Sequence, residues 1–587
     1  MIRLADYVMN FLVSRGVKQV FLLPGGGAMH LNDALGRCEG LQHISFLHEQ
    51  ALAIAAEAYG QHTNTPGVGL VTSGPGSTNA ITAVAAGYID STPMFILSGQ
   101  AKRSDLKTGT GVRQMGSQEV DIVSMVSCIT KYAVTVLEPE KIRYHLERAW
   151  HEATSGRMGP VWLDVPLDVQ GAMIDEDALE GYGPPTPIFP EIPVSQLAEL
   201  LHASERPLLL IGNGVKLAGC AERLIAWAKS NHIPMLLTWK TADLLAHDDP
   251  MYFGFPGIMG ARYANFIVQN ADLLIIAGSR LDPSLTAFKS EDFGRNAKKV
   301  MADIDEAEIR KIKNIDVRIV APAERFVAAL ETVSGLPERP GWLAHCRSLK
   351  AKYPVFDGVL KDPAGPVDLY CFTDELFNQL VATDVIVPES SGAAGEVTYQ
   401  GMKIKQGQKV KNAAGLGSMG FGLPYAIGAC LAHDRRRTVL INGDGAFQMN
   451  IQELETVVRL GLPIKMFILD NAGYGSIVTT QRNMFNGFKV GSDPESGLTL
   501  PDVCRQAQAY GIRTLTIADN ASLKAKIAET LSGDDPVICK VCVTPNHVTM
   551  PKVQAQRLPD GRMLSKPLED MFPYLPEEEL RQAMRFS

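Results

Sequence analysis

The stretch from Asn442 to Gly475 constrains the fold more strongly than any other part of the chain. An aliphatic run at 438–441 precedes it and is typical of a buried strand. Gly443-Asp444-Gly445 then predicts a tight turn, and a segment with helical apolar spacing follows. The residues expected on the buried face of this helix are Ile451, Leu454, Val457 and Val458.

A second apolar run at 464–469 comes after Gly461 and Pro463, which should end the helix. It leads into a polar turn that contains Asn471. The order of strand, glycine turn, helix and strand predicts a βαβ unit, in which both turns lie at the carboxyl ends of neighbouring parallel strands. The glycines would let the backbone approach a diphosphate, whose charge the helix N-terminus stabilises.

Asp444 and Asn471 place two hard oxygen ligands at this edge of the predicted sheet. Mg²⁺ takes few protein oxygens when phosphates and waters complete its coordination shell. The stretch therefore predicts a site for Mg²⁺ and a diphosphate. The alternative is an ordinary βαβ unit that binds nothing.

The composition narrows the class of protein. The chain has 587 residues, enough for three or four domains. The net charge of −8 without a basic stripe argues against nucleic acid as a partner. Nine scattered cysteines suit a reducing compartment, so we expect a cytoplasmic protein. Cys539 and Cys542 fall on a predicted strand and should face opposite ways, which favours buried packing over a redox or zinc site.

No apolar run reaches the roughly 18 residues of a membrane span, so no membrane association is expected. The first residues predict an amphipathic helix over Leu4–Arg15 rather than a signal peptide, and no transit peptide is expected.

Alternating helix and strand patterns predict an α/β fold with three doubly wound parallel-sheet domains. The expected domains are 1–180, 190–345 and 367–545, followed by a proline- and charge-rich tail over 546–587. A proline-rich connector follows the first domain. One short sequence pattern occurs in both outer domains. Gly74-x-Gly76, Asn79 and Pro93 in the first correspond to Gly443-x-Gly445, Asn450 and Pro463 in the last. This repeat predicts that the two domains share a topology.

The chain resembles the acetolactate synthase family of thiamine diphosphate (ThDP) enzymes over nearly its whole length. The runs that carry the resemblance are PGGGAMHLNDAL, HEQALAIAAEAYG, TSGPGSTNAITAVAAGYIDSTP, GPVWLDVPLDVQ, DIDEAEI, GLGSMGFGLPYAIGA, NGDGAFQMNIQELET, and PDG with PLEDM in the tail. The resemblance implies an aminopyrimidine-binding domain, a middle domain and a diphosphate-binding domain. It also implies a homo-oligomer whose active sites lie between subunits.

The resemblance assigns roles to several residues. Glu49 would hydrogen-bond to the aminopyrimidine of ThDP, since a buried carboxyl group can retain the proton that this contact requires. The alternative for Glu49 is an acid that stabilises a helix N-terminus. Gly25 and Gly26 would face the reacting carbon, and Gln118 would lie near the substrate. The other implied ThDP contacts are Met419 (an apolar wedge under the bent cofactor), Gly417, Gly443, Asp444, Gly445, Ala446, Asn471 and Gly473, with Asp444, Asn471 and the carbonyl of Gly473 as Mg²⁺ ligands.

The middle domain resembles one that binds FAD without a redox role in the main reaction. The implied contacts are Gly212, Gly214, Gly278, Ser279, Arg280, Asp303 and Ile304. An empty nucleotide-binding-like domain is the alternative.

The chain departs from the family where acetolactate synthases hold the second 2-keto acid. Thr480 stands at the position of a tryptophan, Pro283 and Ser284 replace an Asp-Arg pair, Leu167 replaces a lysine, and Ser390–Gly395 replaces a glutamine-rich segment. A carboxylate is held best by arginine donors, and these are missing. We therefore expect pyruvate as donor and, as acceptor, a ketone or aldehyde without an acid group, such as a nucleotide-linked keto-deoxysugar.

Three other functions stay open at this point. The chain could join two pyruvates as an acetolactate synthase, act as a simple 2-keto acid decarboxylase or related lyase, or be a non-catalytic nucleotide-binding protein that kept the fold. Intact Glu49, Asp444 and Asn471 argue against the last of these.

Overall fold

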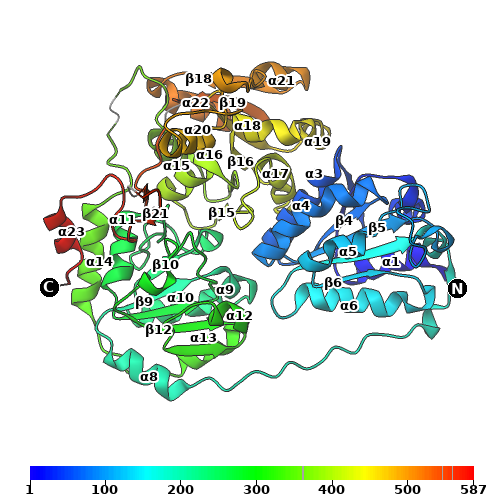
Figure 1. Ribbon diagram of the computed structural model, residues 1–587, viewed down its shortest axis with the longest axis horizontal. Coiled ribbons are helices and arrows are strands. Elements are labelled where there is room, and N and C mark those ends of the chain that lie inside the picture. Colours follow the sequence, from blue (N-terminus) through cyan, green and yellow to red (C-terminus); the bar gives the residue numbers. More distant parts are fainter. Residues whose placement is uncertain (360–361, 545–546, 558–559, 587) are drawn as a thin grey trace.

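Three parallel β-sheets, each flanked by helices, make up the chain (Figure 1). The computed structural model describes residues 1–359, 362–544, 547–557 and 560–586. The α/β class predicted from the sequence is confirmed. The predicted domain limits stay predictions, and the limit at 545/546 lies outside the described residues.

The first and last sheets have the same strand order. The first runs β3-β2-β4-β5-β7-β6 and the last β15-β14-β16-β17-β19-β18, with all neighbours parallel. The strands of the first sheet are β2 (Gln19–Leu22), β3 (Gln42–Ser45), β4 (Gly67–Val71), β5 (Met94–Gln100), β6 (Tyr132–Thr135) and β7 (Pro160–Pro166). Those of the last are β14 (Val385–Pro388), β15 (Lys409–Val410), β16 (Thr438–Gly443), β17 (Ile464–Asp470), β18 (Arg513–Ile517) and β19 (Val537–Cys542). The similar topology predicted from the repeat is confirmed.

The middle sheet has five parallel strands in the order β10-β9-β11-β12-β13. They are β9 (Pro207–Ile211), β10 (Met235–Leu237), β11 (Leu273–Ala277), β12 (Lys298–Asp303) and β13 (Val317–Val320). Residues 179–193 reach this domain without helix or strand, as the long connector in Figure 1 shows, and helix α8 (Val194–Ala203) begins it.

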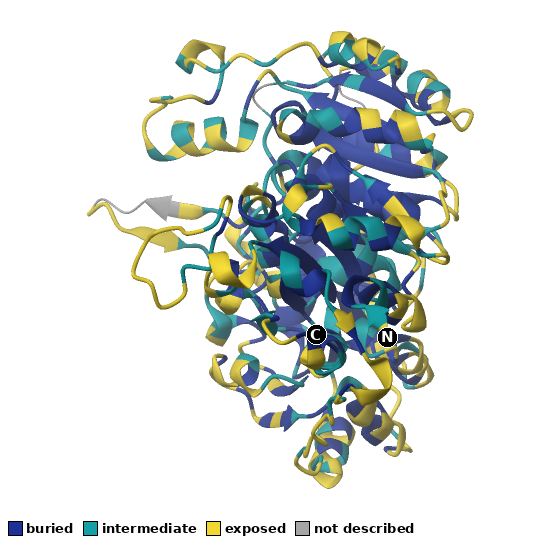
Figure 2. Cartoon of the chain, turned by 90° about the vertical axis from the view of Figure 1, so that its right-hand side faces the viewer, coloured by how far each residue is buried: buried dark blue, intermediate teal, exposed yellow. Residues whose placement is uncertain are grey.

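The segment after β19 folds back onto the middle domain. It contains the hairpin of β20 (Ala555–Arg557) and β21 (Met563–Ser565), and helix α23 (Glu577–Ala583). In Figure 2 the strands inside the body are buried, and the exposed residues lie mainly on the outer helices and loops. Asn265 in α11 (Arg262–Asn270) donates to the carbonyl of Leu568 at 2.9 Å, and Gln269 donates to Glu569 at 2.9 Å. The C-terminal segment therefore belongs to the packed structure of the middle domain.

Helices α3 (Glu49–Thr63) and α17 (Gly422–Ala432) join the first and last domains. Both are rich in Ala and Gly and are buried on nearly all sides, as expected for a helix without a polar face. A Cβ on Gly428 would lie 2.2 Å from the carbonyl oxygen of Ala55, so only glycine allows this approach. His62 and His433 meet at the C-terminal ends of the two helices, 2.9 Å apart, which places both N-termini at the opposite end.

Two local predictions in the Asn442–Gly475 stretch are wrong. No separate turn follows β16, because helix α18 (Asp444–Phe447) begins at Asp444 itself. The next helix is also interrupted, since Asn450 has non-helical backbone angles between α18 and α19 (Leu454–Leu460). This break changes which side faces inward: Leu454 and Val457 are buried, but Val458 is 39 % exposed.

Among the described residues, no helix is long and apolar enough to cross a membrane.

A buried carboxylate braces the edge of the first sheet. Asp164 on β7 accepts hydrogen bonds from Ser98 at 2.6 Å, Gln100 at 3.0 Å and Thr135 at 3.1 Å. Burial raises the pKa of Asp164 to about 7, although the three donors oppose the shift.

This raised pKa predicts a pH-dependent stability. The folded protein binds more protons than the unfolded chain between the ordinary pKa of an aspartate and about 7, so the free energy of unfolding falls as pH rises through that range. The Asp164 contribution should fall by about 2 kcal/mol between pH 5.5 and 8. Urea unfolding of Asp164→Asn should lack this component. Asp168→Asn is the control, because the pKa of Asp168 is lowered; an unchanged pH dependence in Asp164→Asn would contradict the prediction.

Candidate active site

The carboxyl ends of β16 and β17 bring together the residues predicted to bind a metal. The two strands pair in parallel with Gly443 opposite Leu469, so Asp444 and Asn471 follow at the same edge. Asp444 Oδ2 accepts from the backbone N–H of Asn471 at 3.2 Å and of Gly473 at 3.3 Å. Its other oxygen accepts from Gly445 N–H at 2.8 Å.

One terminal atom of the Asn471 side-chain amide lies close to two oxygen atoms. This atom lies 2.7 Å from the carbonyl oxygen of Gly473 and 3.2 Å from Asp444 Oδ1. As a nitrogen it would donate to both; as an oxygen it would complete a set of three converging oxygens, which repel one another unless a cation lies between them. The amide can turn either way, because the two orientations differ only in the exchange of oxygen and nitrogen.

This donor set fits Mg²⁺. One carboxylate, one amide oxygen and one carbonyl oxygen leave positions for phosphate oxygens and water. Burial, followed by the neighbouring Asp470 carboxylate, raises the pKa of Asp444 to about 7; Asp470 itself pairs with Lys540 at 2.7 Å. Among the described residues, no cluster of three or more His, Cys, Asp or Glu forms a competing metal site.

The backbone that could bind a diphosphate consists of glycines at the N-terminus of helix α18. Gly443 precedes α18, and a Cβ there would meet nothing within 4 Å, so the backbone is open. Gly445 is covered by the ring of Tyr474, which a Cβ would approach to 2.5 Å. Ala446 lies in the same short helix.

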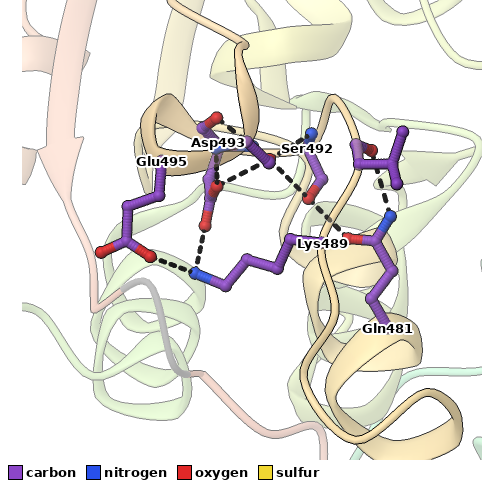
Figure 3. Close-up of polar contacts among 7 residues, drawn as sticks. Gln481, Lys489, Ser492, Asp493 and Glu495 are labelled. Carbon is purple, nitrogen blue, oxygen red and sulfur yellow. Dashed lines mark hydrogen bonds and ion pairs between the residues drawn. The ribbon is translucent and has the colours of Figure 1, made fainter.

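The loop that follows the metal residues is locked by a polar network (Figure 3). Helix α20 (Gly475–Met484) carries Gln481, which accepts from Ser492 Oγ at 2.7 Å. The carbonyl of Ser492 accepts from Tyr474 N–H at 2.8 Å and leaves only 2.4 Å for a Cβ on Gly473. Lys489 pairs with Asp493 at 2.6 Å and Glu495 at 2.8 Å. The network thus fixes the backbone on which the Gly473 carbonyl lies.

In the first domain a second cluster gathers around Thr72, at the end of β4. Thr72 Oγ1 accepts from Gly27 N–H at 3.1 Å, and a Cβ on Gly25 would lie 2.5 Å from Thr72 Cβ. Glu49, the first residue of α3, is 8 % exposed and accepts from Asn79 Nδ2 at 3.0 Å. Glu49 Oε1 lies 3.3 Å from the position of a Cβ on Gly76.

The remaining predicted residues of this domain lie at the rim of the cluster. Gly26 is exposed, and a Cβ there would meet nothing within 4 Å. Gln118 is exposed with a left-handed backbone, φ +59°, and its carbonyl would be 2.4 Å from a Cβ on Gly74. Gln118 therefore lies directly over the start of helix α4 (Pro75–Asp90).

The Gly417–Met419 loop precedes α17, at the same end of the helix pair as Glu49. Met419 is half-buried, and Gly417 has a left-handed backbone, φ +65°. Asn450 bridges the two helix starts: its amide donates to the carbonyl of Gly420 at 2.8 Å and to Gln50 Oε1 at 3.3 Å. Among the described residues, no hydrogen bond joins Glu49 to Asp444 or Asn471.

Sequence reasoning missed the roles of the two asparagines. Asn79 and Asn450 occupy corresponding places in the repeat, and each contacts the first turn of α3. Their shared place in the repeat was the sequence signal that could have predicted these roles. The helical break at Asn450 is what lets its side chain reach both neighbours.

The predicted nucleotide site is a cavity of about 1070 Å³ between all three domains. Gly214, Gly278, Ser279, Arg280, Asp303 and Ile304 line it. Gly212 does not: it packs behind the wall, where a Cβ would lie 2.3 Å from the carbonyl of Gly278. Burial raises the pKa of Asp303 to about 6. A cavity of this size at the carboxyl ends of parallel strands suits a dinucleotide.

The last domain supplies the opposite wall of this cavity. Ser390, Ser391 and Glu396 lie there, around helix α16 (Gly392–Gly401). A Cβ on Gly392 would be 3.3 Å from Ser476 Oγ, so this wall adjoins the loop after Asn471. The cavity and the metal cluster are therefore neighbours.

Three α/β domains, two of one topology, combine with an oxygen cluster at Asp444 and Asn471 where two parallel strands end. This combination defines a ThDP enzyme. The chain matches the thiamine pyrophosphate enzyme family in its N-terminal TPP binding domain over residues 2–125, its central domain over 194–330 and its C-terminal TPP binding domain over 391–541.

Curated relatives narrow the family. The chain is 31 % identical over 556 residues to acetolactate synthase isozyme 1 large subunit of Escherichia coli K12, covering 94 % of this chain and 95 % of the relative. It is 32 % identical over 571 residues to the isozyme 2 large subunit of the same organism, covering 97 % and 99 %. A probable acetolactate synthase large subunit of Methanocaldococcus jannaschii is 32 % identical over 575 residues, covering 95 % and 94 %. The chain belongs to the acetolactate synthase family and is a ThDP-dependent enzyme of the carboligase type.

The metal cluster yields a direct prediction. Asp444→Asn removes the carboxylate charge among three oxygens, so ThDP binding in the presence of Mg²⁺ should weaken by about a hundredfold, or about 3 kcal/mol. Isothermal titration with ThDP measures this. The control is Glu529→Gln, which removes an exposed carboxylate paired with Arg513 in the same domain. Equal ThDP affinity in Asp444→Asn and the wild type would contradict the assignment.

Proposed function

We propose that this enzyme decarboxylates pyruvate and transfers the two-carbon unit to a ketone or aldehyde that carries no carboxylate, such as a nucleotide-linked keto-deoxysugar. ThDP, when bound with Mg²⁺, supplies the electron sink for decarboxylation and carbon–carbon bond formation. The observation that carries the proposal is the convergence of Asp444, Asn471 and the Gly473 carbonyl next to a cavity wall without free cations.

The roles of the chain's own residues follow from their positions. Glu49 would hold a proton against the aminopyrimidine, with Asn79 fixing its carboxyl group. Gly25 and Gly26 would leave room for the reacting carbon, with Gln118 at the entrance. Met419 and Gly417 would support the bent cofactor. As the resemblance to the family implies, we propose that the complete site forms between two subunits.

The cavity wall next to the metal loop supports an acceptor without an acid group. Among the described residues, the part of this wall that the last domain supplies includes no Lys or Arg. On the wall next to the metal loop, Glu396 would repel a carboxylate, whereas the hydroxyl groups of Ser390 and Ser391 suit a hydroxylated acceptor.

Product analysis tests this proposal. Purified protein receives ThDP, Mg²⁺ and labelled pyruvate, with either no acceptor, 2-ketobutyrate, a neutral aldehyde or a nucleotide-linked keto-deoxysugar, and products are read by mass spectrometry. We expect labelled adducts with neutral acceptors at a higher rate than acetolactate or acetohydroxybutyrate. Glu396→Gln should shift the ratio towards the keto acids, whereas Glu324→Gln, at the middle-domain side of the cavity, should not.

The second candidate is acetolactate synthesis from two pyruvates, which the names of the relatives favour. Acetolactate formed as fast as CO₂ is released, with no preference for neutral acceptors, would support it and overturn the first proposal. Release of free aldehyde alone would indicate a 2-keto acid decarboxylase.

We also propose that the middle cavity holds FAD in a non-redox role. A bound flavin should give the purified protein a yellow colour. Ile304→Trp would fill part of the cavity and should lower the flavin content, read from the visible absorbance of the protein. Arg318→Trp is the control, because this exposed residue on β13 lies outside the cavity wall. Colourless wild-type protein that gains no flavin on incubation with FAD would exclude the assignment.

A further inference from the structure

A buried ion pair joins the first and middle domains beside the segment that leads to Met419. Lys240 Nζ lies 2.6 Å from Asp90 Oδ2, with side-chain exposures of 13 % and 4 %. Lys240 comes from the middle domain, and Asp90 is the last residue of α4. A buried ion pair seldom adds net stability, because desolvation offsets its attraction. The Lys240–Asp90 pair is therefore better explained by what it positions than by stability.

Both partners also bind the last domain. Lys240 Nζ donates to the carbonyl of Asn412, and Asp90 Oδ2 accepts from Gly415 N–H at 3.4 Å. Each contact is to backbone, so neither depends on the side chains of the segment. The pair therefore holds the backbone of residues 412–415 by hydrogen bonds from two domains.

Other contacts fix the rest of this short segment. Asn412 Nδ2 donates to the carbonyl of Glu389 at 3.1 Å, and Tyr399 donates to Asn412 Oδ1 at 3.2 Å. Lys411 Nζ donates to the carbonyl of Gln61. Gly415 is the last residue that the Lys240–Asp90 pair contacts. The Leu416–Met419 stretch beyond it is exposed or half-buried. The position of that stretch thus depends on how residues 412–415 are held.

We propose that Lys240 and Asp90 are positioning residues that hold the Gly415–Gly420 loop in place for the coenzyme. The inference rests on the proposed function, in which Met419 and Gly417 contact ThDP. It adds that the middle domain takes part in coenzyme binding through Lys240, which lies outside the metal cluster, lines the cavity and contacts the segment before the loop.

The chain offers a matched control in a second buried pair. Lys216 and Asp243 lie 2.5 Å apart, with side-chain exposures of 17 % and 1 %. Both belong to the middle domain, and neither hydrogen-bonds to residues 412–415 among the described contacts. Lys216 and Asp243 also act electrostatically, with opposite sign, on Lys411. The control is therefore the double variant Lys216→Met/Asp243→Asn, which removes both charges and leaves the contacts of Lys240 and Asp90 with residues 412–415 in place.

The experiment has two readouts. Hydrogen–deuterium exchange of the peptide covering 411–420, in protein without coenzyme, reports the order of the loop. Isothermal titration with ThDP and Mg²⁺ reports the affinity. Lys240→Met should speed exchange in this peptide and weaken ThDP binding by about tenfold, as for loss of a residue that supports a primary contact. The control double variant Lys216→Met/Asp243→Asn should change neither the exchange of this peptide nor the ThDP affinity.

The double variant Asp90→Asn/Lys240→Met keeps the test decisive if Lys240→Met folds poorly. It leaves no uncompensated charge, so folding should recover, while the hydrogen bond to Asn412 stays lost. Fast exchange and weak ThDP binding in this variant support the proposal; recovery of both to wild-type values overturns it. If wild-type protein binds no ThDP, the proposed function fails, yet the exchange comparison still decides whether the pair orders the loop.

Discussion

The rest of the structure depends on the direct backbone contact between helices α3 and α17. Gly428 against Ala55 lets these two helices approach with almost no side chain between them, and both are buried on nearly all sides. Because the helices run in the same direction, their N-termini lie at one end. Glu49 begins one helix, and the Met419 loop leads into the other. The close approach at Gly428 and Ala55 therefore helps to set where two groups of candidate catalytic residues lie.

The functional groups stand at strand ends and helix starts, where backbone N–H groups are unpaired and partial positive charge gathers. Asp444 takes three of these N–H groups, and Glu389, buried behind it, takes two from Ser390 and Gly422. Burial nevertheless raises the pKa of Glu389 to about 7. Buried carboxyl groups and few free cations make the last domain suited to binding a cation together with its phosphate ligands.

The middle domain serves more than one purpose. Its cavity reaches the wall beside the metal loop, and the C-terminal segment returns to pack on it through Leu568 and Glu569. Lys240 connects it to Asp90 and to the segment before the coenzyme loop. The middle domain is thus coupled to the other two, because the three domains share buried polar contacts and not only a connecting segment.

The sequence by itself determined the three α/β domains, their common topology at the two ends, and the Asp444–Asn471 edge, because hydrophobic periodicity and glycine turns are local signals. It did not determine the helical break at Asn450 or the exposure of Val458, since both follow from side-chain contacts with α3 and the loop before α17. The sequence also predicted Gly212 as a lining residue of the cavity, whereas Gly212 packs behind Gly278, which lines it. Only the tertiary structure decided that Lys240 and Asp90 meet, because a pairing between residues so distant in sequence leaves no pattern in either segment.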